Sequence, residues 1–437
     1  ISVYNRSKEG EMEVSKQPVE LLMMCVPLKH DPFTPFPNAQ YRAEVSPYEE
    51  LFEHRTEETT RIISHLIVDI YRQCLSQRRR FMFSVLFLED YARLIRWDWA
   101  GVVFSARFNW KAGDPFLAEF LWQYNQMSAD DRGHDETLSK PTANEISLTK
   151  EKLDEHARGL ARAKGEDPRA PLPRRYSTDD TFVKFLVDEE NDDGREVVAV
   201  EHFFVASLPQ TLDPPETGNG MATYEALDLQ TGKLVYLKDT WRPRDPLFQD
   251  ERRTYRALVG NYVPRLPPLV CAGVVGGQIT CTDQAAGQPW CCSGAFPGSY
   301  EHYRIVYGAL GRPLSEANST KELCQVIYEA AESHYLATYR TALIHCDISG
   351  DNIRITNDGH ALLLGWESSQ MMKKDAKTDE IGAIGKWEFL SATIQSGDKN
   401  CHAFVDDAES FLYVLLYYSI RYHARTPPDV PALRATF

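Results

Sequence analysis

A short loop near residue 350 carries two side chains with complementary chemistry. Asp347 lies five residues before Asn352, between the apolar stretches 343–344 and 353–355. A carboxylate can accept a proton from a reacting group, and an amide oxygen can ligate a metal ion. His345 precedes both residues, and we interpret it as an internal structural residue instead of the base. The loop is therefore a candidate site, and the role of each residue depends on the segments around it.

Upstream of this loop, a pair of glycines precedes a strand-like segment that ends in a lysine. Gly218 and Gly220 are two residues apart, and the apolar run 234–237 leads directly to Lys238. Backbone amides of a Gly-x-Gly turn can approach phosphate oxygens closely, and a strand lysine can pair with the same phosphates. Thr223 stands where a third glycine often occurs, so a plain hairpin remains an alternative interpretation.

The order of these segments resembles the fungal-type protein kinase family, a divergent branch of the protein-kinase superfamily. The resemblance extends from about Tyr48 to Ser419 and rests on blocks in a fixed order, at residues 92–101, 238–242, 302–304, 311–314, 345–352, 385–392 and 407–411. It implies an α+β chain with a bilobal protein-kinase-like fold. A small N-lobe of antiparallel strands is expected before a mainly helical C-lobe, with an N-terminal α+β region ahead of both.

The resemblance also implies a role for each matching residue. Lys238 would contact the α and β phosphates of ATP, held by a helix carboxylate for which Glu251 is the best candidate. Asp347 would accept the proton of a substrate hydroxyl, and Asn352 would hold one magnesium ion. Asp407 would brace the catalytic loop from the start of a buried helix. The implied cofactors are ATP and magnesium, and the glycine pair would contribute to ATP binding.

One position departs from the kinase pattern in a way that affects magnesium. The apolar run 361–364 leads to Gly365, where related enzymes have the aspartate that chelates the metal between the β and γ phosphates. A metal ion neutralises charge that develops in the transition state, so losing its ligand slows transfer. Asp351 and Glu367 flank the expected metal position and are the two candidate substitute ligands. Magnesium binding is therefore predicted to be impaired.

Further departures leave three functions open. Cys346 replaces an arginine, Lys386 a threonine and Thr393 a glutamate of the kinase pattern. The first function is ATP-dependent phosphotransfer to Ser/Thr hydroxyls of proteins. The second, which these residues favour slightly, is a catalytically weak or inactive pseudokinase that acts as a nucleotide-binding or scaffolding module. The third is a small-molecule phosphotransferase, against which the segment 385–392 argues because it resembles a peptide-docking element.

Composition limits the partners and the location. With 43% hydrophobic and 25% charged residues, the sequence is that of a globular protein. The formal charge of -15 argues against a nucleic-acid partner, and the basic run 78–80 is interpreted as a solvated turn. The nine cysteines show no zinc-ligand spacing, which favours a cytoplasmic or nuclear protein. The apolar stretch 21–28 is too short to span a membrane. The expected partner is a protein, and the oligomeric state is open.

Periodicity and composition divide the chain into five segments. They are an N-terminal arm over 1–47, an α+β region over 48–127, a polar linker or insertion over 128–178, a kinase N-lobe with its hinge over 179–300, and a C-lobe that is cut short over 301–437. Recurrence of apolar residues predicts a helix over 57–74. Helices are also expected over 115–124 and 145–163, and the resemblance implies a buried helix over 409–420. Strands are expected over 81–88, 92–105, 182–187 and 197–205.

Overall fold

The protein is described here by a computed structural model that covers the chain in several ranges. They are residues 2–4, 19–25, 57–88, 90–163, 176, 181–189, 200–213, 220–244, 251–285, 288, 298–308, 311–372, 385–397 and 402–423. Helices and mostly antiparallel sheets are both present, which confirms the predicted α+β class. Within these ranges, no helix is long and apolar enough to cross a membrane.

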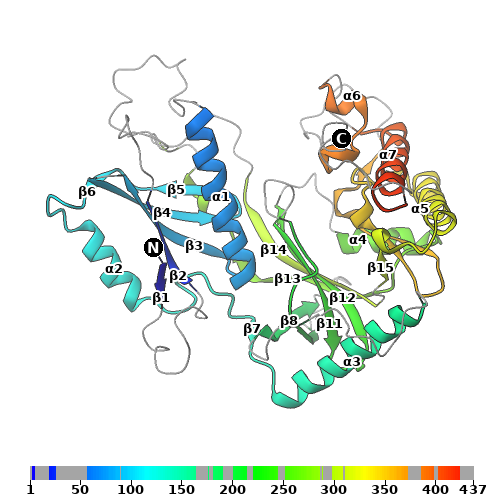
Figure 1. Ribbon diagram of the computed structural model, residues 1–437, viewed down its shortest axis with the longest axis horizontal. Helices are drawn as coiled ribbons and strands as arrows, with labels where there is room; N and C mark the ends of the chain where they lie inside the picture. The colour runs from blue at the N-terminus through cyan, green and yellow to red at the C-terminus, as the bar shows by residue number, and fades with distance from the viewer. Residues whose placement is uncertain are drawn as a thin grey trace, which may run out of the picture.

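The first sheet belongs to the N-terminal part of the chain (Figure 1). In spatial order it contains β1 (Ser2–Tyr4), β2 (Val19–Cys25), β3 (Phe81–Leu88), β4 (Tyr91–Asp98) and β5 (Gly101–Phe104), and β6 (Phe108–Asn109) pairs with β4. The strands β2 and β3 pair in parallel, whereas the other described pairs of this sheet are antiparallel. Strand β3 matches the segment predicted at 81–88, and β4 and β5 match the segment predicted at 92–105, with the expected interruption at residues 98–101 formed by a turn between them.

Two helices cover opposite faces of this sheet, because side chains alternate along β3. Helix α1 (Glu57–Gln77) packs its apolar residues with Met82 and Leu86. Helix α2 (Phe116–Gln126) packs with the intervening Val85 on the other face. Both helices were predicted from the sequence, α1 by its apolar spacing, and α1 extends the predicted segment by one turn at its C-terminal end.

The second sheet lies in the middle of the chain and carries the candidate site. Its strands are β7 (Leu138–Ser139), β8 (Val183–Glu189), β9 (Val200–Ala206), β10 (Thr211–Asp213), β11 (Met221–Asp228), β12 (Leu234–Pro243), β13 (Leu269–Ile279) and β14 (Tyr300–Tyr307). The spatial order is β13-β14-β12-β11-β9-β8-β7, with β10 on β11. The sheet curls until β8 meets β13, where a Cβ at Gly273 would lie 1.8 Å from the carbonyl oxygen of Asp188. A glycine is required at this contact.

Helix α3 (Ala143–Ala163) follows β7 and packs against the same sheet (Figure 1). Its Ile146 and Leu153 form a buried cluster with Phe182 and Val205. The helix predicted over 145–163 is therefore confirmed, and this polar segment buries an apolar stripe.

The C-terminal part is mainly helical, with short strands between the helices. The helices are α4 (Glu251–Gly260), α5 (Thr320–Thr341), α6 (Ala392–Gln395) and α7 (Phe404–His423). The strands are β15 (Arg312–Pro313), β16 (Leu343–Ile344), β17 (Ile353–Ile355), β18 (Ala361–Leu363) and β19 (Gln370–Met371). Leu323 of α5, Val414 of α7 and Ile353 of β17 share one buried cluster. The loop between β16 and β17 is thus anchored at both ends in this core.

The basic run at residues 78–80 is not the solvated turn that its charge suggested. Arg79 is only 2% exposed, and its guanidinium donates to the backbone oxygen of Arg132 at 2.9 Å. Arg78 donates to the backbone oxygen of Ser207 at 3.0 Å. The run joins the end of α1 to two segments that are distant in sequence. The run is buried because its guanidinium groups donate to backbone oxygens of other segments. The local sequence pattern does not show these distant acceptors.

Candidate functional site

The loop that contains Asp347 is held in place by one buried carboxylate. Oδ2 of Asp407, in the first turn of α7, accepts hydrogen bonds from the backbone N–H groups of His345 at 2.9 Å and Cys346 at 3.1 Å. It also accepts one from Nε2 of His334 in α5 at 2.8 Å. Burial opposes ionisation, but the hydrogen bond from His334 outweighs it and the pKa of Asp407 lies well below its usual range. Asp407 therefore ties α5 and α7 to the loop.

Asp347 and Asn352 lie side by side in this loop. Nδ2 of Asn352 donates to the backbone oxygen of Asp347 at 2.8 Å and to its Oδ2 at 2.9 Å. The other carboxylate oxygen of Asp347, Oδ1, is buried and has no hydrogen-bond partner. Burial, reinforced by the charge of Glu367, raises the pKa of Asp347 to about 6. A carboxyl group with such a pKa can exchange a proton near neutral pH, as a general base must.

Lys238 reaches from β12 to two carboxylates. Its Nζ lies 3.7 Å from Oε2 of Glu251, the first residue of α4, and forms a closer ion pair with Oε1 of Glu367. Only 5% of Lys238 and 2% of Glu251 are exposed. Burial alone would lower the pKa of Lys238, but the two negative charges outweigh it and hold the pKa above its usual value. The lysine and the glutamate chosen from sequence are thus brought together.

The carboxylates around Lys238 outnumber this cation. Glu251, Asp347 and Glu367 each have one buried oxygen without a hydrogen-bond partner. Burial and the charge of Glu367 raise the pKa of Glu251 to about 7. Burial of Glu367 is outweighed by Lys238, which lowers the pKa of Glu367. Unsatisfied buried polar atoms are rare in native proteins and mark places for an ion, water or ligand. The name lysine site is used below for five residues: Lys238, Glu251, Asp347, Glu367 and Asn352.

Gly365 stands directly beside Asn352. Its φ of 83° is a left-handed conformation that favours glycine. A Cβ atom at this position would lie 2.4 Å from Cγ of Asn352. The amide of Asn352 therefore occupies the space into which an aspartate at position 365 would project. The packing of Asn352 therefore leaves no space for a side chain at position 365.

His345 has a structural role in this arrangement. Its Nε2 donates to the backbone oxygen of Leu364 at 2.7 Å, and its Nδ1 accepts from the backbone N–H of Asp347 at 3.3 Å. Its ring lies against Trp366, with 4.6 Å between the ring centroids. Burial lowers the pKa of His345 to about 4, so the ring is neutral. These contacts support its interpretation as an internal residue.

Three further residues named from sequence lie elsewhere. Gly218 is outside the described residues. Gly220 packs against the ring of Trp99, because a Cβ at Gly220 would lie 2.2 Å from Cε3 of that ring. Asp351 forms an ion pair with Lys386 at the surface. Of the two substitute metal ligands considered, Glu367 is therefore the one that lies in the lysine site.

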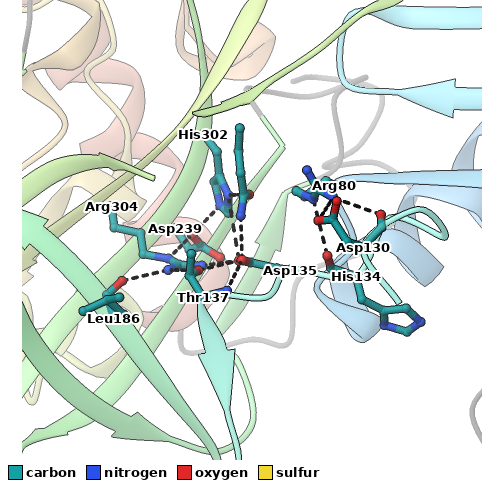
Figure 2. Close-up of polar contacts among 10 residues, drawn as sticks. Arg80, Asp130, His134, Asp135, Thr137, Leu186, Asp239, His302 and Arg304 are labelled. Carbon is teal, nitrogen blue, oxygen red and sulfur yellow. Dashed lines mark hydrogen bonds and ion pairs between the residues drawn. The ribbon is translucent and has the colours of Figure 1, made fainter. Parts of the chain in front are cut away.

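A second polar cluster, which sequence reasoning missed, gathers around Arg304, Asp239 and Asp135 (Figure 2). Lys238 and Asp239 are adjacent on β12, so their side chains project to opposite faces of the sheet. The cluster is called the arginine network and consists of Asp135, Thr137, Asp239, Gln278, His302 and Arg304. A signal for it was present in the sequence, because the family blocks 238–242 and 302–304 contain three of its members.

The fold and the lysine site define the class of protein. A lysine on a sheet strand that is paired with a helix glutamate, together with an aspartate and an asparagine five residues apart in a loop, is the residue set of protein kinases. Residues 220–419 match the family model described as fungal protein kinase, which supports a fungal-type protein kinase family for this part of the chain. No curated protein matches the chain.

Proposed function

We propose that the chain is an ATP-binding kinase-like protein that transfers phosphate to Ser/Thr hydroxyls of a protein. In this proposal the fold is bilobal, with the sheet from β7 to β14 in the small lobe and helices α5 to α7 in the large one. The observation that carries the proposal is the ion-paired position of Lys238 between Glu251 and Glu367, next to the loop of Asp347. The match of residues 220–419 to the kinase family supports it.

Each residue of the lysine site has a task in such a transfer. Lys238 holds the α and β phosphates of ATP, and Glu251 fixes its direction. Asp347 accepts the proton of the attacking hydroxyl through its free Oδ1. The hydroxyl oxygen then bonds to the γ phosphorus, and the bond from this phosphorus to the bridging oxygen breaks. The products are a phosphate ester and ADP, and the proton remains on Asp347.

The residues also fit a magnesium ion. Magnesium in kinase sites is held by one or two carboxylates and by substrate phosphates, so it does not need a complete protein cage. In the described part of the chain, no cluster of three His, Cys, Asp or Glu side chains forms such a cage. The unpaired carboxylate oxygen of Glu367, with the amide oxygen of Asn352, would hold the ion, which leaves Oδ1 of Asp347 to accept the proton. The ion would neutralise charge on the phosphates.

A second candidate is a pseudokinase that binds nucleotide without transferring phosphate. The observation that favours it is the contact between Gly365 and Asn352, because the usual metal-binding aspartate has no space there. Binding by Lys238 would survive this loss, whereas transfer depends on metal neutralisation. The two candidates differ in turnover and share the same nucleotide contacts. A protein partner and a cytoplasmic or nuclear location remain predictions under both.

The experiment compares ATP affinity by calorimetry, with and without magnesium, in the wild type and in Lys238→Ala. We expect a loss of about 10- to 100-fold in affinity, since a charged hydrogen bond contributes about 1.5–3 kcal/mol. The matched control is Lys233→Ala, an exposed lysine that precedes β12. Unchanged affinity in Lys238→Ala would contradict nucleotide binding at this site.

Transfer is measured separately with radiolabelled ATP and a generic protein substrate. The variant Asp347→Asn should keep ATP affinity and lose label transfer, because it removes only the proton acceptor. Binding without any transfer in the wild type would select the pseudokinase. Transfer that persists in Asp347→Asn would show that this residue is not the base.

A further inference from the structure

Four of the six residues of the arginine network are buried behind the strand that carries Lys238, and Thr137 and Asp239 are partly buried. Arg304 on β14 is 0% exposed, and its Nε donates to Oδ1 of Asp239 at 2.9 Å. Its Nη1 donates to Oγ1 of Thr137 and to the backbone oxygen of Leu186, each at 2.8 Å. Its Nη2 forms an ion pair with Asp135. One guanidinium thus joins β12 to two segments that precede the family match (Figure 2).

A second path joins the same two aspartates through His302. Nε2 of Gln278 donates to Oδ1 of Asp135 at 2.6 Å, so its amide oxygen is left to accept from Nδ1 of His302 at 2.7 Å. The other ring nitrogen of His302 faces Oδ1 of Asp239 at 2.6 Å. Both ring nitrogens of His302 therefore face polar groups of the same network. His302 and Gln278 together form a second link between Asp239 and Asp135, beside the link through Arg304.

Aromatic packing holds the same face of β12. Trp99, from the N-terminal sheet, stacks on Trp241 of β12 with 5.9 Å between ring centroids. Trp241 in turn stacks on His302 with 4.7 Å between centroids. These stacked rings and the arginine network both end on β12, immediately after Lys238. Most of their contacts would be lost if the strand shifted along its axis.

The backbone on the N-terminal side of Asp135 is held by Arg80, which lies outside the matched residues 220–419. Arg80 donates to the backbone oxygens of Asp130 at 2.9 Å and His134 at 3.3 Å, and it pairs with the carboxylate of Asp130 (Figure 2). The backbone N–H of Arg80 donates to the backbone oxygen of Gly133 at 2.8 Å. The segment that delivers Asp135 is therefore fixed to β3 of the first sheet.

We infer that Asp135 is a positioning residue for Lys238: through Arg304 and Asp239 it fixes β12 in the register that points Lys238 at bound phosphate. This inference rests on the proposed function. It assigns the N-terminal part of the chain a task in nucleotide binding, although that part contributes no residue to the lysine site. Since coupling between binding events is reciprocal, bound ATP also stabilises the docking of the segment that carries Asp135.

The test is a double-mutant cycle on the full chain, read as the calorimetric affinity for ATP with magnesium. The variants are Asp135→Asn, Lys238→Ala and the double variant. We expect Asp135→Asn to weaken binding about 5-fold in the wild type, within the range of couplings between residues of one network. In the Lys238→Ala background, the same change should have no further effect. A general loss of structure would weaken binding equally in both backgrounds.

Two further variants keep the test decisive. Asp90→Asn breaks the exposed ion pair with Lys111 at 2.6 Å, which includes no residue of β12 or of the arginine network, and should leave ATP affinity unchanged. Thr137→Ala removes one hydrogen bond to Arg304 and one to Asp135 without stranding a charge, and it replaces Asp135→Asn if that variant fails to fold. We expect the same background-dependent pattern from it, about 2-fold in size.

The outcomes separate this inference from the proposed function. If Lys238→Ala weakens binding but Asp135→Asn and Thr137→Ala do not, or act equally in both backgrounds, the positioning role is wrong and the nucleotide site stands. If Lys238→Ala leaves binding unchanged, the proposed function is wrong and the positioning role is wrong with it.

Discussion

The two faces of β12 differ in whether their buried polar atoms have hydrogen-bond partners. Behind the strand, each buried side-chain nitrogen or oxygen of the arginine network has a hydrogen-bond partner among the described residues. In front of it, the lysine site contains three carboxylates, each with a buried oxygen that lacks such a partner. Satisfied buried networks make a fold specific, whereas unsatisfied ones carry a free-energy cost. The comparison assigns structure to one face and ligand binding to the other.

The difference also separates stability from activity along one strand. Neighbouring residues, Lys238 and Asp239, belong to the two clusters, so a change in either one acts on a different property. Removing a partner from the arginine network leaves a buried charge uncompensated. Removing a carboxylate from the lysine site relieves repulsion between its negative charges. The following variants test this contrast, beginning with the largest expected effect.

Arg304→Leu should destabilise the protein strongly. It leaves Asp135 and Asp239 buried without their shared cation, and breaking a buried pair in this way costs about 3–5 kcal/mol. The free energy of unfolding is measured by urea denaturation. The control is Arg242→Leu on the same sheet, whose pair with Glu301 is 19% and 18% exposed and should contribute less than about 1 kcal/mol. Equal effects in both variants would remove the distinction drawn for the arginine network.

Gly365→Ala should destabilise the protein by about 1–3 kcal/mol, because φ is positive and a Cβ atom would displace Asn352. Gly359→Ala is a matched control, since Gly359 has nearly the same φ, 84°, and its nearest neighbour, Oε1 of Glu322, is 3.5 Å away. Denaturation of the two variants isolates the cost of the contact with Asn352. If they are equally destabilised, Asn352 does not exclude a side chain at position 365.

Asp407→Asn should change the pH dependence of stability and cost about 1–2 kcal/mol at neutral pH. The pKa of Asp407 is lower in the folded protein than its ordinary value of 3.8, so ionised Asp407 stabilises the fold above about pH 4. The contribution disappears as the pH falls below that value. Thermal unfolding at several pH values should show a steeper acid loss for the wild type than for the variant. Parallel curves would exclude this role of Asp407.

Much of the fold was visible in the sequence because its signals are local. Helix α1 and strand β3 follow from apolar periodicity, and the loop of Asp347 follows from a motif with fixed spacing. The pairing of Lys238 with Glu251 was inferred only through the family resemblance. The ion pair between Glu367 and Lys238 was not predicted. Glu367 lies two residues after Gly365, and the sequence alone does not show in which direction its side chain points.

The arginine network shows why the rest was not predictable. Asp135 lies in a polar segment that composition marks as a linker, and nothing in the adjacent residues indicates a buried partner. Its burial depends on Arg304, a residue far along the chain, so only the assembled sheet reveals it. Similarly, the basic run at residues 78–80 is buried because distant backbone oxygens surround it.

The most direct test of the account is the ATP affinity of Glu367→Gln, measured with and without magnesium. The variant removes one of the crowded carboxylates and its competition for Lys238. ATP affinity without magnesium should therefore rise, by about 3- to 10-fold for a relief of roughly 1 kcal/mol. The gain in affinity that magnesium confers on the wild type should disappear. A magnesium effect equal to that of the wild type, with no rise in its absence, would contradict the assignment of this face to ligand binding.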